Sequence, residues 1–132
     1  MEKIGIICEY NPFHNGHMYH IQKIKEMYPD SFLVLILNGY FLERGEVSIL
    51  TKEDKTKIAL FYGIDLVVEL PALYGTQSAD IFADISVTLL HHLKVEKLIF
   101  GSELNDISLL NKIVEEVECP TYQETVQKFL KE

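Results

Sequence analysis

Two histidines flank a glycine in the segment His14-Asn15-Gly16-His17. The apolar run Ile4–Cys8 before it predicts a buried strand, Asn11-Pro12 favours a turn, and an amphipathic helix is expected to follow. A helix N-terminus has free N–H groups and the positive end of the helix dipole, and both favour anions. Histidines there can donate to phosphate oxygens, and Gly16 lets a ligand approach the backbone closely. The first prediction is therefore a nucleotide triphosphate site.

The elements that must position these residues alternate between strands and helices. The predicted strands are rich in Ile, Val and Leu without clean alternation, as in parallel strands covered on both faces; they are Lys3–Cys8, Phe32–Asn38, Asp65–Leu70 and Glu96–Phe100. Apolar stripes over residues 18–28 and 79–93 predict helices, and capping signals occur at Thr51, at Asn105 or Asp106, and as a capping box at Thr121 after Pro120. The pattern predicts an α/β fold with a parallel sheet and right-handed crossovers.

Ligands of such sheets bind outside the carboxyl ends of the strands. The segments that follow the predicted strand ends, and should share one rim, are Glu9–Gly16, Asn38–Leu50, Pro71–Gln77 and Gly101–Asn105. The second of these is long for a structureless connection, and loops of that size usually carry function.

The composition limits the classes of function. A chain of 132 residues with 48% apolar content predicts one globular domain, residues 1–132, with a real core. A formal net charge of −8, with Arg44 as the only arginine, argues against nucleic-acid binding by this chain alone, because neutralising phosphates dominates that affinity. Two cysteines far apart and no long apolar run predict a cytoplasmic protein with no disulfide and no membrane contact.

The string Glu9-Tyr10-Asn11-Pro12-Phe13-His14-Asn15-Gly16-His17-Met18-Tyr19-His20 resembles the N-terminus of the bacterial tRNA(Met) cytidine acetate ligase family. Further matches follow in order along the chain, at residues 38–46, 65–71, 77–83 and 100–103. The family belongs to the HxGH superfamily of adenylyl-transferring α/β proteins. The resemblance implies a Rossmann-like, three-layer nucleotidyltransferase fold of the HUP type. It also implies that this chain stops before the last strand and the tRNA-binding part of the longer family members.

The resemblance implies an activity and a set of ATP-binding residues. Family members activate acetate with ATP as acetyl-adenylate, release pyrophosphate, and acetylate N4 of the wobble cytidine of elongator tRNA(Met). ATP binding carries over onto Gly101 and onto the run Ile7, Cys8, Glu9, Tyr10, Asn11, Pro12, Phe13, His14, Asn15, Gly16, His17, Met18, Tyr19 and His20. Further ATP contacts of the family belong to a later Ser/Thr-rich motif with an arginine, beyond Glu132. The expected partners are ATP, acetate and tRNA(Met).

Attack of acetate on the α-phosphate gathers negative charge, so catalysis should depend on positioning and charge stabilisation. His14 and His17 are the predicted catalytic donors, and Mg²⁺ is expected on the phosphates because protein cations are scarce. One alternative is that these histidines are an ordinary polar helix start. Another is zinc held by His14, His17 and His20, but structural zinc usually has four ligands including cysteines, so no metal site is predicted.

Each remaining candidate site residue also has an explanation that involves no ligand. Arg44, Lys52, Lys55 and Gln77 are candidate contacts to substrate or RNA, although lysines at a helix start are usually a solvated face. Asn11 and Asn15 are expected to shape the loop and cap the helix. Two rival functions stay open: another HxGH adenylyl- or cytidylyltransferase acting on a small phosphorylated substrate, and a non-catalytic nucleotide-binding remnant.

Overall fold

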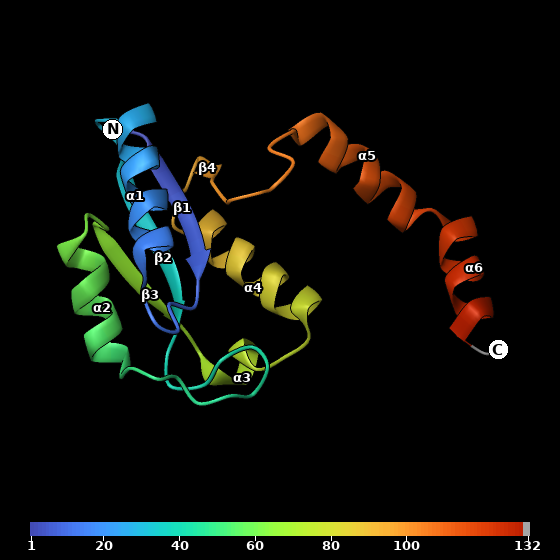
Figure 1. The fold of residues 1–132 in the computed structure, drawn as a ribbon, viewed down its shortest axis with the longest axis horizontal. Coiled ribbons are helices and arrows are strands. Elements are labelled where there is room, and N and C mark those ends of the chain that lie inside the picture. Colours follow the sequence, from blue (N-terminus) through green and yellow to red (C-terminus); the bar gives the residue numbers. More distant parts are fainter. Residues whose placement is uncertain (131–132) are drawn as a thin grey trace. The chain divides into compact units, whose positions relative to one another are not determined.

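The computed structural model describes residues 1–130 (Figure 1). The chain divides into two compact units, Met1–Phe100 and Gly101–Glu132. The first unit contains the sheet, and the second contains helices α5 (Ile107–Glu118) and α6 (Pro120–Leu130). The single domain expected from the sequence stays a prediction. No helix within residues 1–130 is both long enough and apolar enough to cross a membrane.

The sheet of the first unit has four parallel strands in the order β3-β2-β1-β4. They are β1 (Lys3–Cys8), β2 (Phe32–Asn38), β3 (Leu66–Leu70) and β4 (Lys97–Leu98). The chain runs outward from β1 to β3 and then returns to the other side of β1. The point where the order reverses therefore lies between β1 and β4, and ligands of doubly wound sheets bind at the carboxyl ends of strands at such a point. The predicted parallel sheet is confirmed.

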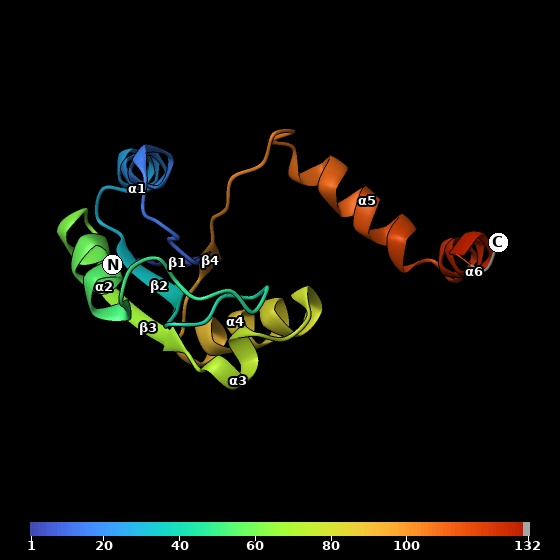
Figure 2. The same cartoon turned by 60° about the horizontal axis from the view of Figure 1, so that its bottom comes forward.

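Helices cover both faces of this sheet (Figure 2). They are α1 (Asn15–Met27) and α2 (Lys52–Phe61) on one face and α4 (Ala79–His92) on the other, and the short α3 (Ala72–Gly75) follows β3 and leads into α4. One core cluster joins Leu33, Leu35 and Leu37 of β2 to residues of α1 and α2. The other joins Val34 and Ile36 to residues packed from α4. β2 is thus buried on both faces, which explains its unbroken apolar sequence and confirms the three-layer prediction.

The helix caps in the structure can be compared with the caps predicted from the sequence. Thr51 Oγ1 accepts from the Asp54 amide at 3.1 Å, and Asp106 Oδ1 accepts from the Leu109 amide at 3.1 Å, as predicted. The capping box predicted at Thr121 is wrong. Helix α6 already begins at Pro120, because proline suits the first helical position, so Thr121 lies inside the first turn.

Candidate functional site

The turn between β1 and α1 is shaped by a buried aromatic ring. Tyr10 has a left-handed backbone with φ of 49°, and its side chain is only 2% exposed. Its ring lies 4.9 Å from that of Phe13, edge-on, and 4.6 Å from that of His17, centroid to centroid. A left-handed conformation costs a non-glycine residue about 1 kcal/mol, which burial of a tyrosine ring offsets. The turn therefore has one well-defined shape next to the histidines.

The two histidines of the HxGH segment cap α1 themselves. His14 is the N-cap residue, and its Nδ1 accepts from the Gly16 amide at 3.0 Å, while His17 Nδ1 accepts from the His14 amide at 3.2 Å. The imidazole rings stack with centroids 3.8 Å apart. Capping by Asn15 was therefore a wrong prediction, because Asn15 is already the first helical residue. With both Nδ1 atoms accepting, each neutral ring carries its proton on Nε2, as a donor.

Burial keeps the His17 ring neutral. Burial lowers the pKa of His17 to about 4, and repulsion from His14 and His20 adds to the effect. Burial also lowers the pKa of His20, whose buried Nε2 has no hydrogen-bond partner among residues 1–130. At neutral pH His17 thus presents an N–H donor without a positive charge. An approaching anion would favour its protonation.

Gly16 is required by the His14 ring. A Cβ built on Gly16 would lie 2.9 Å from Cε1 and 3.0 Å from Nδ1 of His14. A larger residue would push away the imidazole that caps the helix. This constraint adds a reason for the glycine beside the predicted close approach of a ligand.

The long loop after β2 is not structureless. Phe41 and Val47 form an antiparallel bridge, and the Leu42 amide donates to the Glu46 carbonyl at 2.8 Å, so residues 41–47 make a small hairpin with Gly45 at a φ of 80°. Arg44 is exposed at its tip and forms no ion pair with any residue of 1–130. Its predicted contact to substrate or RNA stays a prediction.

Two polar side chains of the first turn hold this second loop. The Glu43 amide donates to Glu9 Oε1 at 3.4 Å, and the Ile49 amide donates to Asn11 Oδ1 at 2.8 Å. The expectation that Asn11 shapes the loop is confirmed. The two loops at the carboxyl ends of β1 and β2 are thus fastened to each other.

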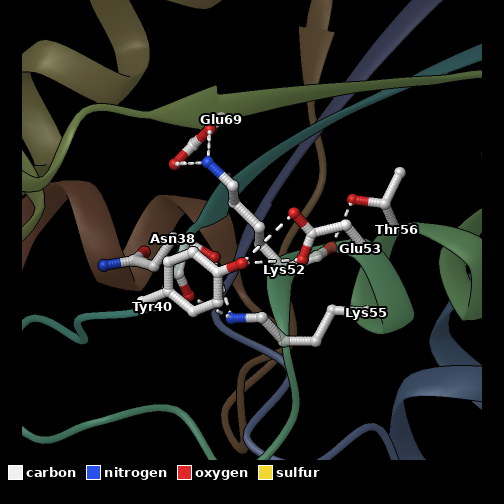
Figure 3. A network of polar contacts seen from close by, with 8 residues as sticks. Asn38, Tyr40, Lys52, Glu53, Lys55, Thr56 and Glu69 are labelled. Carbon is white, nitrogen blue, oxygen red and sulfur yellow. Dashed lines mark hydrogen bonds and ion pairs between the residues drawn. The ribbon is translucent and has the colours of Figure 1, made fainter.

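Lys55 is buried below the two loops and is not available to a ligand. Its side chain is fully buried, and Nζ donates to the carbonyl oxygens of Glu9, Asn38 and Gly39 at 3.2, 2.8 and 2.9 Å. Figure 3 shows Lys55 next to Asn38. Burial lowers the pKa of this lysine. The prediction that Lys55 contacts substrate or RNA is wrong, because an ammonium enclosed by three carbonyls cannot reach an external ligand.

The other candidate contacts lie at the surface. Lys52 pairs with the Glu69 carboxylate at 3.1 Å, and its Nζ lies 5.3 Å from the centroid of the Tyr40 ring (Figure 3). Gln77 is exposed, and its Nε2 donates to the Leu73 carbonyl at 2.9 Å. Their contacts to a ligand stay predictions. Gly101 opens the second unit, and its predicted role toward ATP is likewise untested.

Sequence reasoning missed Asn38. This side chain is 1% exposed, and Nδ2 donates to the carbonyls of Phe41 and Gly75 at 3.3 and 3.2 Å. The available signal was a single amide ending an otherwise apolar strand. Asn38 also contributes to a surface cavity of about 390 Å³ that no histidine lines. The residues that line this cavity are Leu37, Asn38, Lys52, Glu53, Thr56, Lys57, Val67 and Glu69.

The acidic and metal-binding side chains are dispersed. Within residues 1–130, no group of three or more His, Cys, Asp or Glu residues is placed to hold a metal ion. Magnesium commonly binds through one or two carboxylates together with substrate phosphates, and Glu9 is the carboxylate at the end of β1. Its present hydrogen-bond partner is the Glu43 amide.

A parallel sheet that reverses beside β1, with paired histidines opening the following helix, defines a class of nucleotidyltransferases. The chain matches the model of the HIGH Nucleotidyl Transferase family over residues 1–132, and it belongs to that family.

Its relatives among curated proteins include tRNA(Met) cytidine acetate ligases. The chain is 46% identical to the one from Fusobacterium nucleatum over 129 residues, covering 98% of this chain and 33% of the relative. It is 50% identical to the one from Bacillus subtilis over 107 residues, covering 81% and 26%. The resemblance inferred from the sequence is confirmed, and the chain is similar to the N-terminal nucleotidyltransferase region of these ligases.

Solved structures agree with this assignment. A crystal structure of Thermotoga maritima TmcAL bound with alpha-thio ATP superimposes with a TM-score of 0.87 at 36% identity, covering 99% of this chain and 32% of that one. The apo form of the same protein gives a TM-score of 0.88. The chain therefore spans about a third of the length of the relatives it matches.

Proposed function

We propose that this chain binds ATP at the turn between β1 and α1 and forms acetyl-adenylate from ATP and acetate. This is the activating half of the reaction named by its curated relatives. The observation that carries the proposal is the stacked His14–His17 pair, whose δ nitrogens are occupied by backbone amides at the start of α1. The ATP analogue bound to the Thermotoga relative supports the nucleotide.

In the proposed reaction, a carboxylate oxygen of acetate attacks the α-phosphorus of ATP. The bond from that phosphorus to the oxygen bridging to the β-phosphate breaks, and pyrophosphate leaves with the bonding electrons. Negative charge grows on phosphate oxygens during this step. The Nε2–H groups of His14 and His17 and the free amides of α1 would donate to them. Mg²⁺ on the phosphates would supply further shielding of this charge.

The second half would transfer the acetyl group to tRNA(Met). The N4 amine of the wobble cytidine would attack the acetyl carbonyl, the bond from that carbon to the phosphate oxygen would break to release AMP, and the nitrogen would lose one proton to water. With a formal charge of −8, this chain offers little to hold RNA phosphates. We therefore propose that tRNA binding depends on a further protein region, like the two thirds of each relative that this chain does not match. We place this reaction in the cytoplasm.

The test is exchange of labelled pyrophosphate into ATP that depends on acetate. The full chain should support exchange, and His17→Ala should reduce it by on the order of a hundredfold, as loss of one charge-stabilising donor does. His92→Ala, an exposed histidine at the end of α4, should leave exchange unchanged.

Two results would replace the proposal. Exchange that needs a small phosphorylated acceptor instead of acetate would identify another HxGH nucleotidyltransferase. ATP binding by calorimetry without exchange, even when the C-terminal part of a relative is supplied, would identify a nucleotide-binding module.

A further inference from the structure

We propose that Lys55 is the positioning residue of the ATP site, holding the turn after β1 and the loop after β2 in the arrangement that receives the triphosphate. This inference rests on the proposed function. Lys55 itself touches no ligand in this scheme. It acts through the backbone that carries the groups around the ligand.

The first link runs from Lys55 to the histidines. The carbonyl of Glu9, which accepts from Lys55 Nζ at 3.2 Å, belongs to the peptide that enters Tyr10. Fixing that peptide plane fixes the left-handed backbone of Tyr10, whose φ is 49°. The buried Tyr10 ring lies 4.6 Å from the His17 ring, centroid to centroid. The ammonium therefore orients the peptide group that precedes Tyr10, and the Tyr10 ring packs against His17, the predicted phosphate donor.

The second link runs to the loop after β2. Lys55 donates to the carbonyls of Asn38 and Gly39, the last residue of β2 and the first residue of that loop. The Asn38 amide in turn holds the carbonyls of Phe41 and Gly75. One side chain thus joins two loops that are separated by about thirty residues of sequence and that lie at the carboxyl ends of adjacent strands.

The charge state suits this role. An ammonium has three N–H donors and no acceptor, and each donor here has one carbonyl partner. An apolar residue of the same length would leave three acceptors without this partner in a buried place, which destabilises the local arrangement. Loosening is expected in the two loops first, because β2 is held independently by β1 and β3.

The experiment compares the full chain with Lys55→Met and with Lys57→Met, which removes an exposed lysine from the same helix. Hydrogen exchange without ATP should be at least about tenfold faster in residues 9–13 and 39–50 of Lys55→Met, since bonds to a charged donor are lost. Exchange in β2 should be unchanged. Lys57→Met should match the unmodified protein in all these segments.

Calorimetry with ATP completes the test. Lys55→Met should bind ATP about tenfold more weakly, with Lys57→Met unchanged. Lys55→Gln keeps two donors on a shorter stem, should weaken binding less, and serves as the second variant if Lys55→Met does not fold. Unchanged loop exchange, or looser loops with unchanged ATP affinity, would overturn the role of Lys55. Failure of the unmodified chain to bind ATP would instead overturn the proposed function, and this inference with it.

Discussion

Helices α1 and α2 both begin at the carboxyl end of the sheet, yet their N-termini differ. Helix α2 is capped by the Thr51 hydroxyl, and its first turn contains Glu53 and Asp54. Helix α1 is capped by His14 and His17 and has no acidic residue in its first turn. The carboxylates of α2 already complement its helix dipole, whereas the first turn of α1 places no negative charge at the positive end of its dipole. Of these two helix starts, the one of α1 is therefore the better candidate for the proposed phosphate contact.

The largest disruption of this difference should come from Gly16→Ala. Its Cβ would lie 2.9 Å from the His14 ring, so the ring must shift from its present capping position. We expect ATP affinity to fall at least about tenfold, since the shift disturbs the cap and one donor together. Titration calorimetry measures this. Near-normal affinity would show that the stacked pair is not needed for binding.

Giving α1 the electrostatics of α2 should separate stability from binding. Asn15→Asp places a carboxylate in the first turn of α1, which should stabilise the fold by about 0.5 kcal/mol through the helix dipole. The same charge should repel the triphosphate and weaken ATP several-fold, an effect that salt reduces. Urea unfolding and calorimetry on one preparation measure both. If affinity and stability rise together, the anion site lies elsewhere.

The low pKa of His17 predicts a pH dependence of the free protein. Its folded pKa of about 4 lies below the ordinary histidine value of 6.5. Between these two pKa values the unfolded chain binds more protons than the folded chain. The contribution of His17 to the free energy of unfolding is therefore fully present above pH 6.5 and is lost as pH falls toward 4. Urea midpoints at pH 7 and pH 5 measure the slope. His17→Ala should flatten it.

ATP should reverse part of this effect. Phosphate charge beside His17 favours its protonation, so binding should take up protons and strengthen as pH falls from 7 to 5.5. Calorimetry in two buffers of different ionisation enthalpy measures the uptake. Proton release on binding would contradict a phosphate next to this ring.

The smallest effect on ATP is expected from the cap of α2. Thr51→Ala removes the hydroxyl that accepts from the Asp54 amide and should destabilise the fold by about 1 kcal/mol. ATP affinity should be unchanged within error. A loss of affinity matching that of Gly16→Ala would mean that the two helix starts do not differ in the way proposed.

Much of the frame follows from local sequence. The bounds of β1 and β2 agree with the predicted segments, and β3 begins one residue later than predicted, because unbroken apolar runs are a strong local signal. The predicted Glu96–Phe100 strand is reduced to β4, Lys97–Leu98. Pairing with β1 decides this length, and pairing is not encoded in the segment alone.

The sequence by itself determined the order of strands and helices, the HxGH segment and, through their combination, the family. Tertiary structure alone decided that Lys55 is buried, because its carbonyl partners come from two loops remote in sequence. It also decided that Nε2, and not Nδ1, is the free donor of His14 and His17. Periodicity reports which face of an element is apolar, whereas the hydrogen-bond partners of a polar group depend on which other segments the fold brings within about 3 Å of it.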